Sequence, residues 1–470
     1  MNIILIYPEF TDIYGRYKAA AKVGVVYPPL GLMYLASSLE QDGHKVQILD
    51  TEVENLSKTE IIKKIISIKP DFVGITSTTP LHHKATELFK LIKQADPSIK
   101  TISGGPHPTA LPEETLKECQ EIDIVCVGEA EETIREICNE KELVKINGIC
   151  FREKNKIVTT EKRKLIQNLD SIPLPARHLV KNEKYLWSVP KKGIMPVTPI
   201  MTTRGCPYKC VFCSQLVIFG NCMRYRSVDN VIQEIDEIVN KYKIKHLVFY
   251  DDTLGLNKKI TYELIDAIKK EKLDFTFEGM TRVNIVNKEL LEKLKSVGLN
   301  RLSFGVESGN QHILDASKKG ITLEQIRQAY NITSKLGIET RMSIVLGLPF
   351  ETKKTINNTI KFMKSLKCYQ AYVNIGTPFP GTEYYDMAIK GYGGIKLLTK
   401  DWKEYRRWDN AVIEVNDLKR EDLVRYQKKA MLNFYLTPTR LIYNLRRAGI
   451  KAAWVNGMGA VKSLLFTKKK

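Results

Sequence analysis

Short apolar runs alternate with amphipathic helical stretches over most of this chain of 470 residues, and this rhythm limits the folds open to it. Strand candidates in residues 1–150 are Asn2–Tyr7, Lys45–Asp50, Asp71–Thr76, Lys100–Ser103 and Ile124–Val127. Helical stretches such as Leu30–Gln41 and Lys58–Ile68 lie between them. Alternation of this kind predicts a doubly wound parallel sheet covered by helices on both faces. Ligands of such domains bind at the carboxyl ends of the strands.

The rhythm resumes at Pro199. Strand candidates there are Ile200–Thr203, His246–Tyr250, Asp274–Phe277, Arg301–Val306, Glu339–Leu346 and Ala371–Thr377. A full eight-unit barrel needs about 250 residues, so these six units predict a partial (β/α)6 barrel. We therefore expect an α/β protein with a Rossmann-like domain at 1–150, a linker with a small hairpin (Gly148–Thr159) at 151–195, the barrel at 196–385 and a basic helical segment at 386–470.

Three of the nine cysteines, Cys206, Cys210 and Cys213, crowd into one loop after the first barrel strand. Three thiolates at this spacing can hold one metal ion or one face of an iron–sulfur cluster. A four-iron cluster bound by three cysteines leaves one iron open to a substrate or cofactor. Structural zinc, with Cys222 as fourth ligand, is the alternative. The βα context favours the open cluster.

The cysteine spacing, with Phe212 before the third thiol and six βα units behind it, resembles the radical SAM superfamily. The resemblance implies a [4Fe–4S] cluster on the three cysteines, S-adenosylmethionine (SAM) chelated to the fourth iron, its reductive cleavage to a 5′-deoxyadenosyl radical, and a reductant protein of the flavodoxin or ferredoxin type. Motif positions at the strand ends then imply SAM contacts by Phe212, Asp251, Asp252, Arg282, Glu307, Ser308, Gly347 and Glu351. Each could instead be a turn or capping residue.

A doubly wound domain ahead of such a barrel resembles the cobalamin-binding radical SAM class, which includes relatives of the porphyrin oxidative cyclase and the hopanoid methylases. The resemblance implies cobalamin contacts by Ser77, Thr78, Thr79, Gly104, Gly105, His107, Gly128 and Glu129. Glycines allow a bulky ligand to approach the backbone, and hydroxyl groups can donate to it. For His107 a turn role stays open, and we expect His82 and His83 to be surface or capping residues. The loop after the first strand lacks Asp-x-His-x-x-Gly, so a domain without cobalamin is the alternative.

The formal net charge is +20, and no Asp or Glu follows Asp422, whereas many Lys and Arg do. This skew predicts an anionic partner near the C-terminus. Residues 423–470 interleave bases with aromatic residues, which suits peripheral contact with the inner face of a membrane. Packing of the apolar half on the barrel is an equal alternative, and we do not expect a nucleic acid partner. The cysteine usage and the lack of a long apolar run predict a cytoplasmic protein.

These observations predict a cobalamin-dependent radical SAM enzyme that methylates an unactivated carbon of a hydrophobic or lipid-like substrate. One alternative is a radical SAM enzyme of other chemistry, such as cyclisation, oxidation or C–C joining, whose first domain binds no cobalamin. A second is an iron–sulfur electron carrier or a metal-stabilised binding protein.

Overall fold

The computed structural model describes residues 1–17, 26–154, 156–189 and 192–443. Its first sheet has the strand order β2-β1-β3-β4-β5-β6-β7 in this part of the chain. The strands are β1 (Asn2–Tyr7), β2 (Lys45–Asp50), β3 (Phe72–Thr76), β4 (Lys100–Gly104), β5 (Ile124–Cys126), β6 (Ile149–Glu153) and β7 (Lys156–Thr159). The first five pair in parallel. This order places the topological switch point, where ligands of such sheets bind, between β1 and β3.

Helices cover both faces of this sheet, as the apolar runs on both sides of its strands require. The buried side chains of α2 (Leu30–Gln41) and α7 (Glu131–Cys138) pack on one face. Those of α3 (Lys58–Ile68), α4 (His82–Ala95) and α6 (Pro112–Glu118) pack on the other. The expected doubly wound domain is confirmed.

The hairpin expected in the linker is present, but it belongs to the first sheet. Strand β6 pairs antiparallel with β5, and β7 pairs with β6. The sheet therefore extends to Thr159, beyond the expected limit at residue 150. The local sequence showed the hairpin but not the edge to which it adds. The rest of the linker contains a second hairpin, β8 (Leu186–Val189) and β9 (Gly193–Pro196).

The second sheet is the expected partial barrel, and its strands follow chain order as β10-β13-β14-β15-β16-β17. Their bounds are β10 (Thr198–Ile200), β13 (His246–Phe249), β14 (Thr276–Thr281), β15 (Leu299–Glu307), β16 (Glu339–Leu346) and β17 (Gln370–Ile375). All adjacent pairs are parallel. The main covering helices are α9 (Val228–Asp236), α10 (Lys258–Lys270), α11 (Lys288–Ser296), α13 (Leu323–Lys335) and α14 (Lys353–Ser365). Helix α13 starts at a capping box between Thr322 and Gln325, a local signal that fixes its first residue.

The first barrel strand differs from the expected Ile200–Thr203. Strand β10 ends at Ile200, and the chain then forms β11 (Thr203–Arg204), which pairs antiparallel with β12 (Arg224–Tyr225). This pair closes the loop that carries the three cysteines. Pairing across about twenty residues is not visible in the local apolar pattern, so the sequence merged two short strands into one.

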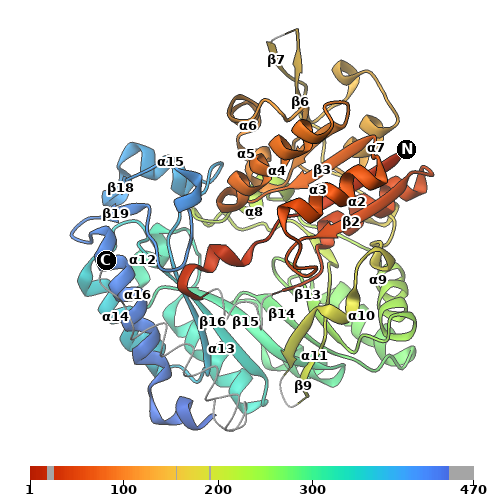
Figure 1. The fold of residues 1–470 in the computed structure, drawn as a ribbon. Helices are drawn as coiled ribbons and strands as arrows, with labels where there is room; N and C mark the ends of the chain where they lie inside the picture. Colours follow the sequence, from red (N-terminus) through yellow and green to blue (C-terminus); the bar gives the residue numbers. More distant parts are fainter. Residues whose placement is uncertain (18–25, 155, 190–191, 444–470) are drawn as a thin grey trace.

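The segment after the barrel is less helical than expected. Helix α15 (Glu383–Lys390) is followed by an antiparallel pair, β18 (Ile395–Leu397) and β19 (Ile413–Val415), a short helix η9 (Trp402–Glu404) between them, and α16 (Arg420–Tyr435). Helix α16 lies beside α14 and β17 (Figure 1). In the part of the chain that the structure describes, no helix is both long and apolar enough to cross a membrane. Residues 444–470 of the basic tail lie outside the described residues.

Figure 1 shows the first domain above the barrel, with the blue C-terminal helices at one side of the barrel. The main core fills the barrel and reaches α16, whose Leu423, Ala430 and Phe434 are buried. Two smaller cores lie on the two faces of the first sheet. This arrangement leaves the facing ends of the two sheets to form a site.

Candidate active site

The loop that carries the cysteines begins at Gly205, where only glycine fits. Its φ is +94°, and a Cβ atom there would lie 2.1 Å from the Cys222 carbonyl oxygen. Residues other than glycine rarely adopt this backbone, and the contact excludes any side chain. The tight turn places Cys206, Cys210 and Cys213 on one loop at the end of the first barrel strand.

The three thiols are partly or fully buried and close enough to affect one another. Cys210 is buried, and Cys206 and Cys213 are half-buried. Burial, together with charge repulsion from Cys210, Asp252 and Cys206, raises the pKa of Cys213 to about 11. Thiolates in such a place need a nearby cation. The residues therefore fit an iron–sulfur cluster, whose iron ions would supply that charge.

Asp251 fixes the start of this loop by hydrogen bonds. The residue follows β13 and is buried, and its Oδ1 accepts hydrogen bonds from the backbone N–H groups of Thr202 and Thr203 at 2.7 and 2.9 Å. Its Oδ2 accepts from the Thr202 hydroxyl at 2.5 Å. Burial raises the pKa of Asp251, and these bonds oppose that rise. The structure thus shows Asp251 as a positioning residue, and its contact with SAM stays a prediction.

Asp252 interacts electrostatically with the cysteine loop. Burial, and then the charge of Asp251, raise its pKa to about 7, while the Gln215 side chain and the Gly205 N–H oppose the rise by hydrogen bonding. Its carboxyl also acts on Cys213. It therefore remains a candidate for the predicted contact with the SAM amino group.

Arg282, after β14, packs directly on the cysteine loop. Its guanidinium carbon lies 3.6 Å from the centroid of the Tyr208 ring, and its Nη1 lies 3.5 Å from Cys210 Sγ. Its Nη2 donates to the Lys319 carbonyl oxygen. The sequence placed Arg282 near SAM. The structure places it beside the predicted cluster, where a fixed positive charge would favour thiolate over thiol.

Glu307 lies at a bulge of β15 and forms a buried ion pair that the sequence did not reveal. Its Oε1 is 2.7 Å from Lys319 Nζ, and its φ is +61°, an uncommon value for a residue other than glycine. A Cβ atom on Gly305 would lie 2.3 Å from this carboxylate and 2.6 Å from Lys319 Nζ. Lys319 Nζ also lies 6.0 Å from the Phe212 ring centroid. Glu307, Lys319 and Phe212 thus lie together beside the cysteines. Gly305, two residues before Glu307, was the one local sign in the sequence of this close packing.

Two other predicted SAM contacts have side chains that bond within the barrel. The Ser308 hydroxyl lies 3.2 Å from the Thr359 hydroxyl on α14. Glu351 is fully buried and accepts from the backbone N–H groups of Gly347 and of Leu348. Burial raises the pKa of Glu351 to about 8, against the lowering effect of those bonds. The side chains of Ser308 and Glu351 are therefore engaged within the barrel, and SAM contact at Ser308, Gly347 and Glu351 stays a prediction.

A cavity of about 540 Å³ lies where the two domains face each other. Its walls in the first domain are Leu5, Gly74, Ile102 and Cys126 on neighbouring strands, under α2 and α7. Its lining also includes aromatic residues and residues of the barrel: Tyr7, Phe10, Tyr14, Tyr27, Met201, Ile218, Phe219 and Tyr250. The cavity thus runs from the face of the first sheet, at its switch point, to the barrel.

The predicted cobalamin residues divide between this cavity and other places. Gly104, Gly105, Gly128 and Glu129 line it. Thr78 and Thr79 line a smaller cavity of about 170 Å³ beside Ser214 and Phe379. Ser77 lines neither, and its neighbour Thr76 lines the large one. Ser77, Thr78 and Thr79 follow the end of β3, and cobalamin contact at these three residues stays a prediction.

The glycines at the cavity wall fit a large ligand. Gly128 has a φ of +85°, and a Cβ atom there would meet nothing within 4 Å. A Cβ atom on Gly104 would meet only Cys126 Cβ, at 3.8 Å. Space is therefore left open beside the backbone, as the approach of a bulky ligand requires. The residues present fit cobalamin.

Glu129 lines the cavity but is held by the barrel. Its carboxylate pairs with Arg204 at 2.9 Å and Arg224 at 2.7 Å, and it accepts from the Ile166 N–H at 2.9 Å. Arg204 also pairs with Glu131 at 2.5 Å. This buried network joins the first domain to the hairpin that closes the cysteine loop. The structure therefore shows Glu129 at the domain interface, which the sequence did not indicate.

His107 is not one of the described residues that line the large cavity. Its ring packs against His82, with centroids 4.2 Å apart, and against Trp402 at 5.2 Å. Burial, and then the neighbouring His82, lower the pKa of His107 to about 3. His82 is buried as well, contrary to the expected surface position, because the segment after the barrel covers it. The expected capping role is confirmed, since His82 is the C-cap of the short helix η2 (Thr79–Leu81).

The fold and the site define a class: a B12-type α/β domain joined to a partial barrel that carries three cysteines at C-x3-C-x2-C. Residues 18–138 match the family model of the B12 binding domain, and residues 200–363 match that of the radical SAM superfamily. An uncharacterized methyltransferase of Pyrococcus horikoshii is 37% identical over 449 residues, which cover 95% of each chain.

More distant similarity points the same way. The anaerobic magnesium-protoporphyrin IX monomethyl ester cyclase of Rubrivivax gelatinosus is 26% identical and covers 99% of this chain and 82% of its own. The radical SAM methyltransferase TsrM of Kitasatospora setae, solved with cobalamin and a [4Fe–4S] cluster, shares the fold with a TM-score of 0.73 at 16% identity, over 98% of both chains.

The chain belongs to the cobalamin-binding radical SAM family. It is a radical SAM enzyme, and the cofactors of its family are a [4Fe–4S] cluster, SAM and cobalamin. The expected class, fold and cofactors are therefore confirmed. A structural zinc site on the three cysteines and a first domain that binds no cobalamin are the alternatives that this result displaces.

Proposed function

We propose that this enzyme methylates an unactivated carbon of a hydrophobic or lipid-like substrate. The observation that carries the proposal is the cavity between the domains, which is lined by four of the predicted cobalamin residues and by barrel residues such as Met201 and Tyr250. These residues would hold cobalamin beside the barrel. The name of the Pyrococcus relative also supports methyl transfer.

The aromatic residues that line the cavity support a hydrophobic substrate. Tyr27 packs edge-to-face against Tyr250, with ring centroids 5.5 Å apart, and lies against Trp187 in a tilted arrangement at 4.7 Å. Aromatic side chains offer large apolar contact areas with polar edges. Burial of an apolar surface in such a place is favourable at about 25 cal/mol per Å².

When bound, the cluster and SAM would supply the radical that abstracts hydrogen, and cobalamin would supply the methyl group. The chain's own residues would prepare the site. Cys206, Cys210 and Cys213 would hold the cluster, and Arg282 would favour their thiolate forms. Asp251 fixes the loop, and the Arg204–Glu129 pair keeps the two cofactor sites at a fixed separation.

Reconstitution tests the proposal. The protein, loaded anaerobically with iron, sulfide and methylcobalamin, is incubated with SAM, a reductant and a lipid extract of the host. We expect 5′-deoxyadenosine, S-adenosylhomocysteine and a lipid heavier by one methylene unit. A Cys213→Ala variant is the control and should yield none of these. A product of unchanged carbon number, formed with 5′-deoxyadenosine but without S-adenosylhomocysteine, would contradict methylation.

Cyclisation is the second candidate, and the similarity to the magnesium-protoporphyrin ester cyclase favours it over other chemistry. In the same assay, a cyclase would give a product without added carbon. The electron donor we propose is a flavodoxin- or ferredoxin-type protein. It should replace the chemical reductant in this assay.

Contact of residues 423–470 with an anionic membrane also remains a proposal. Helix α16 packs its apolar side on the barrel, as the packing alternative predicted for this part. Leu436, Leu441 and Ile442 are exposed beyond it and would face the membrane. The full chain should sediment with anionic liposomes at low salt, and a chain ending at residue 436 should not. Equal sedimentation of the two would overturn this proposal.

A further inference from the structure

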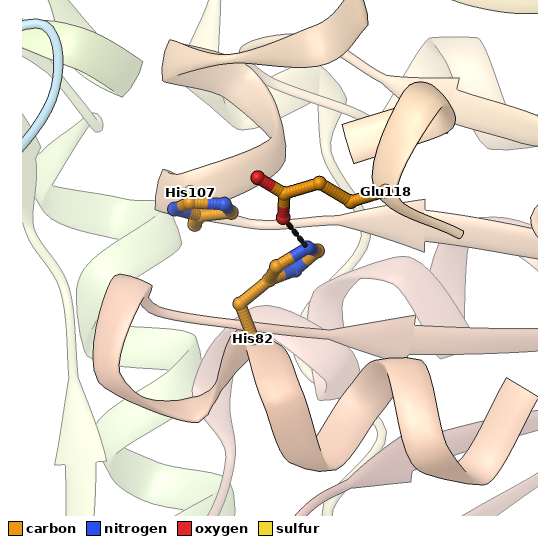
Figure 2. Close-up of side chains that lie close together, drawn as sticks. All are labelled: His82, His107 and Glu118. Carbon is orange, nitrogen blue, oxygen red and sulfur yellow. Dashed lines mark ion pairs between the residues drawn. The ribbon is translucent and has the colours of Figure 1, made fainter. Parts of the chain in front are cut away.

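A second cluster of metal-binding side chains lies in the first domain, apart from the cysteine loop. His82 begins α4, His107 lies in the short helix α5 (Pro106–Ala110), and Glu118 ends α6. One ligand atom from each lies within 4.8 Å of the others. Figure 2 shows the three side chains converging, with the contact between His82 Nε2 and Glu118 Oε2, 3.3 Å long, as a dashed line.

The two histidines are buried with nitrogen atoms that lack a hydrogen-bond partner among the described residues. His82 is 2% exposed and His107 is 1% exposed. Both ring nitrogens of His82 and the Nε2 of His107 make no hydrogen bond, and the contact of His82 Nε2 with Glu118 is an ion pair only when His82 is protonated. Buried polar atoms are almost always paired, so these three need an explanation. A bound cation would satisfy two of them.

The surrounding residues orient the cluster as the neighbours of metal ligands do. The Thr79 hydroxyl lies 3.3 Å from His107 Nδ1, which leaves Nε2 as the nitrogen without a hydrogen-bond partner. The Trp402 Nε1–H donates to Glu118 Oε1 at 3.0 Å, which leaves Oε2 toward His82. Partners of this kind fix the ring and carboxylate of metal ligands in known sites.

We propose that His82, His107 and Glu118 bind a divalent transition-metal ion of the zinc class. Two histidines and one glutamate are an established donor set for zinc. Donor atoms bound at about 2.0–2.2 Å to a tetrahedral ion lie roughly 3.3–3.6 Å from each other. The pair His82 Nε2 and Glu118 Oε2 already has this separation.

The location indicates a structural role for the ion. Trp402 belongs to η9, in the segment after the barrel, and this segment contacts η2 (Thr79–Leu81) and α4 of the first domain. His107 directly follows Pro106, which lines the large cavity. A metal ion here would stabilise the contact between the two ends of the molecule and fix the cavity wall. The proposal does not depend on the reaction that the enzyme catalyses.

X-ray absorption at the zinc edge, with metal analysis, tests it on the full chain loaded with its cluster. After chelation of loose metal and addition of Zn²⁺, we expect one zinc per chain with nitrogen and oxygen ligands at about 2.0–2.2 Å and no sulfur ligands at about 2.3 Å. Zinc bound through sulfur, or no retained zinc, would overturn the proposal.

Variants locate the ion. His107→Ala and Glu118→Gln should each lose the zinc while keeping the cluster iron, and Zn²⁺ should no longer raise their melting temperatures. Glu118→Gln is the milder change because its side chain is 42% exposed and the amide oxygen can still accept from Trp402. His83 is next to His82 in sequence but does not belong to the proposed zinc site. His83→Ala is therefore the matched control and should keep the zinc. Retention of zinc by Glu118→Gln and His107→Ala alike would refute the site.

Discussion

Arg204, two residues before the first cysteine of the loop, donates to Glu129 of the first domain, with Arg204 Nη1 2.9 Å from Glu129 Oε1. The side chains are 5% and 3% exposed. The residue that leads into the predicted cluster site is therefore joined to the wall of the predicted cobalamin cavity. This pair links the positions of the two cofactor sites through one buried contact.

Breaking this pair from one side should destabilise the protein strongly. Glu129→Gln leaves Arg204 and Arg224 with less negative charge nearby, and loss of one partner of a buried pair costs about 3–5 kcal/mol. We expect a clear drop in the urea midpoint of unfolding. Lys318→Met, which breaks the exposed pair with Glu383, is the control and should change stability by less than about 1 kcal/mol. Equal effects of the two changes would show that the buried pair has no special role.

We expect Cys206, Cys210 and Cys213 to bind the cluster and Cys222 not to bind it. Replacement of Cys206, Cys210 or Cys213 by alanine should abolish full iron loading and the formation of 5′-deoxyadenosine, because three thiolates are needed to hold the cluster. Cys222→Ala should retain both, since Cys222 is exposed and lies outside the motif. Iron analysis and nucleoside chromatography measure the result. Loss of iron in Cys222→Ala would favour four-cysteine ligation instead.

A larger side chain at Gly104 should block cobalamin without harm to the cluster. Gly104→Leu would fill the cavity wall, and we expect at least a tenfold loss of affinity, about 1.4 kcal/mol. Gly104→Ala is the matched control, because its Cβ atom would make only an ordinary contact with Cys126. Cobalamin per chain is read from the visible spectrum, with iron content as the reference. Full cobalamin binding by Gly104→Leu would place the ligand elsewhere.

Glu351 should make stability depend on pH. Its pKa in the folded protein is about 8, above the ordinary 4.5, so the folded state keeps a proton that the unfolded chain releases. Stability from this group is therefore full below about pH 4.5 and is lost as the pH rises to about 8. Glu351→Gln cannot lose a proton.

The wild type should therefore lose stability relative to Glu351→Gln as the pH rises from 5 to 8, and the difference between their melting temperatures should grow. The corresponding change in the free energy of unfolding is roughly 4 kcal/mol at most. Scanning calorimetry at several pH values measures this difference. Asp315→Asn, at an exposed position on a barrel helix, is a control that should show no such trend. A constant difference for Glu351→Gln would mean that its carboxyl group ionises normally in the folded protein.

Much of the fold could be predicted because its signals are local. The apolar run of β1 and the amphipathic pattern of α2 gave the observed bounds, and α3 begins at a capping box between Ser57 and Glu60. The three cysteines were predicted as one site for the same reason, since their spacing on one loop brings them together in any fold. Where distant segments decide the outcome, as in the split between β10 and β11, the prediction failed.

The site residues show the same division. Asp251 and Glu129 were predicted as cofactor contacts from their places at strand ends. Their partners, Thr202 and Arg204, lie about 49 and 75 residues away along the chain, so no local pattern revealed that their carboxylates are engaged. Lys319 beside Glu307 was missed for this reason too.

The sequence by itself determined the order of βα units, the grouping of three cysteines on one loop and the family, because periodicity and short-range spacing do not depend on packing. The tertiary structure alone decided which strand-end residues face the cavity, which are taken up in ion pairs between the domains, and that His82 and His107 meet Glu118. These outcomes depend on how the two sheets and the final segment pack. Burial and charge pairing between residues far apart in the chain are set only when that packing is complete.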